Sequence, residues 1–118
     1  MTQLLESDLH ADVRAMLRRW YPPRRGWKIY DRDEKTGIRP DFMVERKEGE
    51  GMERTICEVV AARKITPEHI ARLNHYAESL SDEKITILEK ILAVPAGADT
   101  SIVPPDISVL ILWAHPIE

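Results

Sequence analysis

The sequence has a single cysteine, lacks a long apolar run and starts with residues that are not typical of a signal peptide, and each of these features restricts the class of protein that we expect. Because Cys57 stands alone, an internal disulfide is excluded and a reducing cytoplasm is the expected location. The longest apolar runs, such as residues 109–114, fall far short of the ~20 residues that cross a bilayer, so we expect no membrane span. The start, MTQLLESDLH, has acids where a signal peptide needs a basic end and an apolar stretch.

Several catalytic and binding signatures are also missing. The chain has no glycine-rich phosphate loop and no discernible Ser-His-Asp arrangement. Its four histidines are scattered, and His69 and His75, six residues apart, fall on different faces of a helix. The histidine pattern therefore does not favour a metal site.

What remains is the composition of one ordinary globular domain. The 118 residues fit a single compact unit, residues 1–118, and 43% of them are apolar while 31% are charged. The net charge of -3 and the pI near 5.8 argue against a protein that coats nucleic acid by charge alone.

One segment differs in composition from the chain as a whole. Between Arg14 and Lys28 the chain reads RAMLRRWYPPRRGWK, with six basic residues, three aromatic residues and no acid. Cations neutralise phosphates and aromatic rings stack on bases, so Arg18, Arg19, Arg24, Arg25 and Lys28 form a candidate DNA-contact surface. The alternative is structural: Arg18 and Arg19 fall in the last helical turn, where cations favour the dipole, and Trp20 falls on the buried helix face.

The periodicity predicts an α/β domain with a mixed central sheet, in the order helix, three strands, helix, strand, a short irregular or helical link, and a strand (αβββαβ(α)β). A glycine-bearing turn in KEGEGMER joins the second and third strands as an antiparallel hairpin. Residues 82–90 are ambiguous between helix and strand, and the last strand, apolar throughout, is expected to be buried on both faces. The expected helices are residues 3–20 and 66–81, and the expected strands are 27–30, 41–47, 55–62, 90–97 and 107–113.

The stretch PDFMVERK, residues 40–47, resembles a complete metal-dependent nuclease signature, but distances exclude that. At about 3.3 Å per residue, Asp41 and Glu45 lie ~13 Å apart, and two carboxylates that share a magnesium ion must bring their oxygens within roughly 3 to 4 Å. Glu45, Arg46 and Lys47 are therefore expected to be solvated residues that lead into the hairpin turn.

Glu58 on the next strand is the better partner for Asp41. In an antiparallel hairpin the start of one strand lies beside the end of the other, so these two carboxylates are expected within about 4.5 to 5.5 Å as cross-strand neighbours. Alternation places Cys57 on the opposite face as a buried apolar residue.

These residues and their order resemble the restriction-endonuclease-like superfamily of PD-(D/E)XK phosphodiesterases, over nearly the whole chain. The resemblance implies that Asp41 and Glu58 hold Mg²⁺ or Mn²⁺, with the Val59 carbonyl as a further ligand. It also gives a role to Glu6, since several members place an acid in the first helix. Arg72 and Tyr76, four apart on the later helix, resemble a Gln-x-x-x-Tyr motif of DNA-processing nucleases.

The chain departs from this family at position 60, where Val60 replaces the usual lysine two residues after the glutamate. Valine can neither polarise water nor stabilise charge on a phosphoryl group. Lys64 is the expected stand-in, with Lys28 and Arg72 as other sources of positive charge. The resemblance thus implies a magnesium-dependent DNA nuclease. The alternatives are a non-catalytic relative that binds nucleic acid through residues 14–28 and a protein-interaction or homodimerisation module.

Overall fold

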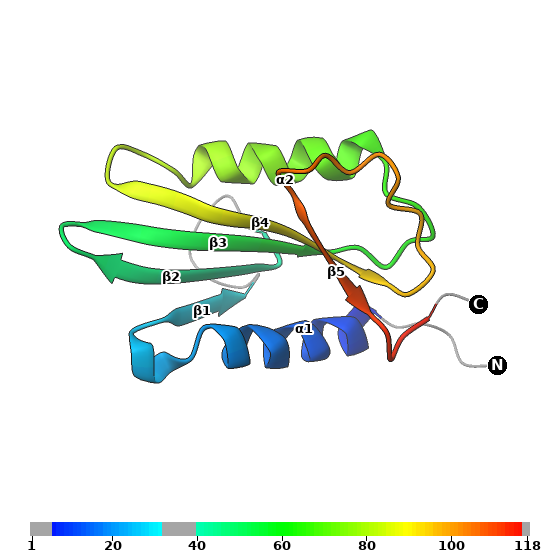
Figure 1. Ribbon diagram of the computed structural model, residues 1–118, viewed down its shortest axis with the longest axis horizontal. Helices are drawn as coiled ribbons and strands as arrows, with labels where there is room; N and C mark the ends of the chain where they lie inside the picture. The colour runs from blue at the N-terminus through cyan, green and yellow to red at the C-terminus, as the bar shows by residue number, and fades with distance from the viewer. Residues whose placement is uncertain (1–5, 32–39, 117–118) are drawn as a thin grey trace.

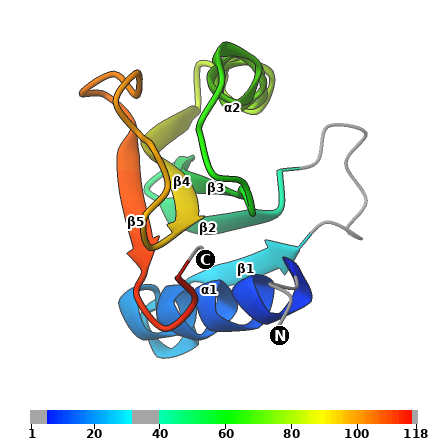
Figure 2. The same cartoon turned by 90° about the vertical axis from the view of Figure 1, so that its right-hand side faces the viewer.

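Two helices cover opposite faces of a five-stranded mixed sheet, so the protein has three layers (Figures 1 and 2). The computed structural model describes residues 6–31 and 40–116, with side chains from residue 9 onward. The described elements are α1 (Glu6–Trp20), the short 3-10 helix η1 (Pro23–Arg25), β1 (Lys28–Asp31), β2 (Phe42–Glu48), β3 (Gly51–Val59), α2 (Pro67–Ser79), β4 (Ile85–Pro95) and β5 (Ser108–Leu112).

The strands lie in sequence order across the sheet. β1, β2 and β3 form an antiparallel meander, and the β2–β3 hairpin turns at Gly49, whose φ of 60° suits glycine. α2 then carries the chain across one face, so that β4 runs parallel to β3, and β5 runs parallel to β4. The carboxyl ends of three neighbouring strands therefore meet at one end of the sheet.

The packing on both faces follows from strand alternation. On one face, Leu9, Val13 and Leu17 of α1 pack on a cluster that includes Phe42 and Cys57, all fully or almost fully buried. The predicted burial of Cys57 is confirmed, and this burial raises the pKa of its thiol well above the usual value.

The other face packs against α2. Leu73, the fully buried residue of that helix, contacts a cluster that contains Ile56, Val60 and Leu92. The helix begins after Thr66, an extended N-cap residue whose main-chain N–H donates to Nδ1 of His69 at 2.9 Å. The Thr66–Pro67 start signal in the sequence is thus confirmed.

Several predicted boundaries were wrong by a few residues. β3 begins at Gly51 rather than at residue 55, because the hairpin turn is tight and Met52 already pairs with Lys47. The ambiguous residues before 90 extend β4 into one strand of 11 residues rather than a helix. The link from residue 96 to 107 contains turns and no helix, which removes the optional helix from the predicted order.

The last strand and Trp20 are more exposed than the sequence suggested. β5 is an edge strand of the sheet, so Ile111 is 36% exposed, and Trp113 beyond the strand is 76% exposed. Trp20, expected on the buried face of α1, is 50% exposed because the helix ends there, beyond the sheet-covering turn at Leu17. An apolar run alone did not distinguish an edge strand from a central one.

The expected solvation of Glu45 and Arg46 was also wrong. Glu45 accepts hydrogen bonds from Arg54 at 3.0 Å and from the Tyr30 hydroxyl at 3.1 Å. The Arg46 guanidinium stacks over the ring of Trp27, with 4.5 Å between guanidinium carbon and ring centroid, and pairs with a neighbouring glutamate. Cross-strand partners therefore hold both side chains against the sheet, while Lys47 is exposed as expected.

No helix within the described residues is long and apolar enough to cross a membrane.

Candidate active site

Asp41 and Glu58 lie side by side at the carboxyl end of β3, as the hairpin predicted. Phe42, the first residue of β2, pairs with Cys57, so the register one step further places Asp41 opposite Glu58. Asp41 is 1% exposed and Glu58 is 6% exposed. They are two of the three buried polar or charged side chains in the described part of the protein.

Main-chain hydrogen bonds fix both carboxylates. The N–H of Asp41 donates to Oε1 of Glu58 at 2.7 Å, and the N–H of Val59 donates to Oδ2 of Asp41 at 2.7 Å. Each acid thus caps the strand that carries the other. This exchange holds the two side chains at one place, where they are shielded from solvent, and it also gives them a structural role.

A third side chain reaches this pair from α1. Nε2 of His10 lies 3.3 Å from Oδ1 of Asp41, and the imidazole ring packs against Phe42 with 5.6 Å between ring centroids. Sequence reasoning missed His10 because it treated the histidines as candidate metal ligands only. The available signal was that His10 is four residues after Glu6, one turn further along the same helix face.

Glu6, the acid predicted from the first helix, begins α1, but its side chain lies outside the described residues. Val59, the predicted carbonyl ligand, ends β3 next to Glu58 and packs its side chain on the α1 side of the sheet. The predicted ligands Asp41, Glu58 and Val59 are therefore brought together.

Lys64 lies on the segment between β3 and α2 and is exposed. This segment is tied to the β4–β5 link, since Ile65 N–H donates to the Asp99 carbonyl and Asp99 N–H donates to the Arg63 carbonyl. Hydrogen bonds from Ser101, with a smaller contribution from the Lys64 charge, lower the pKa of Asp99. The charge of Lys64 acts on Asp99, at the β4–β5 link.

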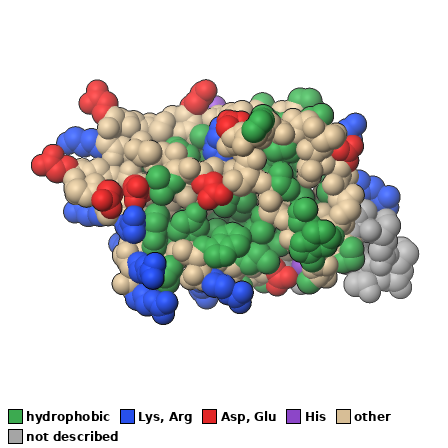
Figure 3. All heavy atoms as spheres, viewed as in Figure 1, with side chains coloured by type: hydrophobic (Ala, Val, Ile, Leu, Met, Phe, Trp, Pro, Cys, Tyr) green, Lys and Arg blue, Asp and Glu red, His purple; other side chains and the backbone are tan. Residues whose placement is uncertain are grey.

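The basic segment lies at the other end of α1. At 1.5 Å per residue, Arg18 is ~12 Å along the helix axis from His10. Arg18, Arg19, Arg24 and Arg25 are all exposed, and basic side chains gather at the lower left of Figure 3, where α1 ends and η1 follows. The structure thus separates the carboxylate pair from most of the predicted DNA-contact residues.

The remaining predicted contact residues are dispersed. Lys28 is exposed at the start of β1, opposite Glu45 in the strand register. Arg72 is exposed on α2, whereas Tyr76, one turn later, packs against the apolar cluster under that helix. α2 covers the face of the sheet opposite α1, so these two residues do not join the arginine segment (Figure 2).

The oxygen atoms of Asp41, Glu58 and the Val59 carbonyl are of the type that magnesium binds. Carboxylate and carbonyl oxygens are its preferred ligands, and it is commonly held by one or two protein carboxylates, with water and substrate phosphates completing the shell. Within the described side chains no group of three or more His, Cys, Asp or Glu residues could hold a metal ion. The pair fits a cation that is shared with substrate better than a closed structural metal site.

No protein-family model, curated protein or solved structure matches this chain.

Proposed function

We propose that this protein is a restriction-endonuclease-like nuclease that hydrolyses phosphodiester bonds in DNA with Mg²⁺ or Mn²⁺ held by Asp41 and Glu58. One observation carries the proposal: two carboxylates from adjacent strands are buried side by side at the end of β3. Main-chain N–H groups and His10 already contact these acids, and a divalent cation held between the two carboxylates would offset their like charge further. The antiparallel meander followed by a helix and a parallel strand also supports the resemblance seen in the sequence.

In this proposal the protein positions the ligands of the cation and shields them from solvent. Asp41 and Glu58 offer carboxylate oxygens, and the Val59 carbonyl is the further oxygen ligand. The Val59 amide and His10 fix the orientation of the Asp41 carboxylate from β3 and from α1. A bound cation would lower the pKa of a water molecule and neutralise charge at the scissile phosphate. Lys64 is the proposed source of the positive charge that Val60 does not supply.

Cation binding and DNA cleavage test this function separately. Manganese binding, followed by the electron-spin resonance of free Mn²⁺, should be lost in Asp41→Asn and Glu58→Gln, which keep side-chain oxygens but remove charge. Cleavage of plasmid, hairpin and branched DNA should fall by more than about a hundredfold, since metal charge stabilisation contributes several kcal/mol. Glu48→Gln, an exposed acid at the end of β2, is the matched control. Cleavage that survives both substitutions would refute the proposal.

A second candidate function is nucleic-acid binding without catalysis, through residues 14–28. The 50% exposure of Trp20 favours it, because an exposed indole beside Arg18 and Arg19 suits base stacking and phosphate neutralisation. The burial of Val60 where the family has lysine points the same way. Salt-sensitive DNA binding with no cleavage in either cation would support this candidate.

A further inference from the structure

The first half of β4 forms an open edge of the sheet. β5 pairs only with residues 91–95 of β4, and Ile85, at the start of β4, pairs with Asp82 in an isolated β-bridge. Within the described residues no strand pairs with the outer edge of residues 86–90, and in Figure 1 β5 crosses only the later part of β4. The outward N–H and C=O groups of this stretch are therefore available to an additional strand.

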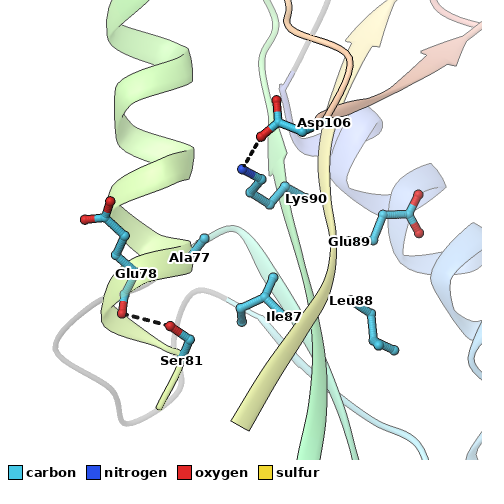
Figure 4. A pocket seen from close by; sticks show the side chains of 8 residues that line it. All are labelled: Ala77, Glu78, Ser81, Ile87, Leu88, Glu89, Lys90 and Asp106. Carbon is cyan, nitrogen blue, oxygen red and sulfur yellow. Dashed lines mark hydrogen bonds and ion pairs between the residues drawn. The ribbon is translucent and has the colours of Figure 1, made fainter. Parts of the chain in front are cut away.

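A groove of about 350 Å³ runs along the same stretch. Figure 4 shows Ile87 and Lys90 pointing toward α2, where Ala77 lines the facing wall, while Leu88 and Glu89 point to the other side of the strand. The strand register slips by one residue here, since Arg54 pairs with Ile87 and Thr55 with Glu89. This bulge leaves Leu88 48% exposed beside the groove. The open edge thus has apolar side chains on both sides.

The charge of the groove is negative. The amine of Lys90 is compensated locally, because it donates to Asp106 at 2.8 Å and to Asn74 at 2.9 Å. Glu89 accepts hydrogen bonds from the hydroxyls of Ser108 and Tyr21, and neither Glu89 nor the exposed Glu78 forms an ion pair with a described cation. The rim of the groove therefore carries two glutamates whose charge no cation of the described residues offsets.

We propose that this open edge binds an extended segment of a partner protein, about five residues long, in which a pair of apolar residues is followed by a pair of basic residues. Main-chain hydrogen bonds to residues 86–90 supply the pairing. Because successive side chains of a strand point to opposite faces, each pair places one side chain on each face. Apolar side chains then cover Ile87 on the α2 side and Leu88 on the other side, and lysine or arginine side chains meet Glu78 and Glu89 in the same way. A second copy of the chain fits less well, since symmetric pairing of two such edges would oppose the same acidic rims. The proposal does not depend on the nuclease function.

The probe is a capped, fluorescein-labelled peptide in which pairs of valines alternate with pairs of lysines. It should bind at least about tenfold more tightly than a valine–glutamate peptide of the same length, because like charges at an interface are strongly disfavoured. In ¹⁵N-labelled protein, the amide shifts should be largest from Ile87 to Lys90. Glu78→Gln should weaken binding, whereas Glu68→Gln, at another exposed glutamate in the first turn of the same helix, should not.

The decisive comparison modifies the peptide and leaves the protein folded as it is. Methylation of the peptide's main-chain nitrogens on the pairing edge removes its hydrogen-bond donors and keeps its side chains, so binding should be abolished. Equal affinity for the methylated peptide, or amide shifts that lie elsewhere, would overturn the proposal. So would self-association of the protein alone with broadening of the Ile87 to Lys90 amides, which would assign the edge to a second copy.

Discussion

The main-chain N–H of Val60 donates to the carbonyl of Ala93 at 2.8 Å, which extends the pairing of β3 with β4 one residue past the end of β3. Its side chain is 8% exposed and lies in the apolar cluster under α2. Val60 is thus a core residue at the position where the resembled family has its lysine. Because Glu58 and Val60 are two residues apart, they face the same side of the sheet.

Val60→Lys should therefore place an amine beside the carboxylate pair. Single-turnover DNA cleavage in Mg²⁺ should rise by at least about tenfold, since a positioned cation stabilises charge on the phosphoryl group. The free energy of unfolding, measured in urea, should fall by about 1–3 kcal/mol because a charged group enters an apolar cluster. Val60→Met is the control: it adds length without charge, so cleavage should stay at the wild-type rate. A folded Val60→Lys protein with unchanged cleavage would show that the missing lysine does not limit the reaction.

The hydrogen bond from Val59 to Asp41 should matter for stability irrespective of any metal. Asp41→Ala leaves the Val59 N–H without its acceptor in a buried place, and this should lower the free energy of unfolding by about 1–3 kcal/mol. Asp41→Asn keeps an acceptor oxygen and should cost less. Urea unfolding at neutral pH without divalent cations measures both. Equal losses in the two variants would show that the charge of Asp41, rather than its hydrogen bond, stabilises the fold.

The sequence was informative wherever a local rule determined the structure. Glycine and proline signals located the hairpin and the start of α2, and antiparallel geometry was enough to predict Asp41 beside Glu58. The failures involve relationships between distant segments. An apolar run has the same period in an edge strand and in a central strand, so the exposure of β5 depended on whether a further strand lies beyond it, which its own residues do not encode.

Side chains with long-range partners were the other source of error. From its place before the hairpin turn, Arg46 was expected to be solvated, but its guanidinium stacks on the ring of Trp27, which lies on another segment. His10 gained its place near Asp41 only through the packing of α1 across β2 and β3. The sequence does not contain the angle at which a helix crosses a sheet, so neither contact followed from spacing.

Because the pKa of His69 is lowered, we expect the protein to lose stability in mild acid. Burial, together with the charge of Arg72, lowers the pKa of His69 below its ordinary 6.5, and its Nδ1 accepts the Thr66 N–H only when that nitrogen is unprotonated. Because the unfolded chain binds this proton more readily, the hydrogen bond from Thr66 to His69 contributes its full stabilisation above pH 6.5. This stabilisation is lost as the pH falls through the lowered pKa of His69 in the folded state.

The variant His69→Gln isolates this effect. Glutamine keeps an acceptor for the Thr66 amide but does not titrate, so urea unfolding of the variant should depend less on pH than that of the wild type below pH 6.5. Measurements should stay above 4.5, the ordinary pKa of a glutamate, where the exposed Glu68 begins to contribute. His75→Gln, on the exposed side of the same helix, is the control and should retain the wild-type pH dependence. An unchanged slope in His69→Gln would rule out this source of acid sensitivity.

The exposed end of α1 predicts how nucleic acid would bind. Replacement of Arg18, Arg19, Arg24 and Arg25 by glutamine should reduce the slope of log affinity against log salt by about 0.9 for each duplex phosphate that the variant no longer neutralises. Glutamine at Lys47 and Lys84, exposed cations near the β2–β3 hairpin, is the control and should leave the slope unchanged.

Substitution of Trp20 distinguishes base stacking from charge neutralisation at the same surface. Trp20→Ala should weaken binding of single-stranded DNA by about 1–3 kcal/mol per stacked base and leave the salt slope as it is, because the cations that meet the phosphates all remain. Trp113→Ala, at a still more exposed indole beyond β5, should have no effect. Fluorescence anisotropy of a labelled oligonucleotide over a salt series measures affinity and slope together. A loss of equal size in both tryptophan variants would mean that residues 14–28 are not the nucleic-acid surface.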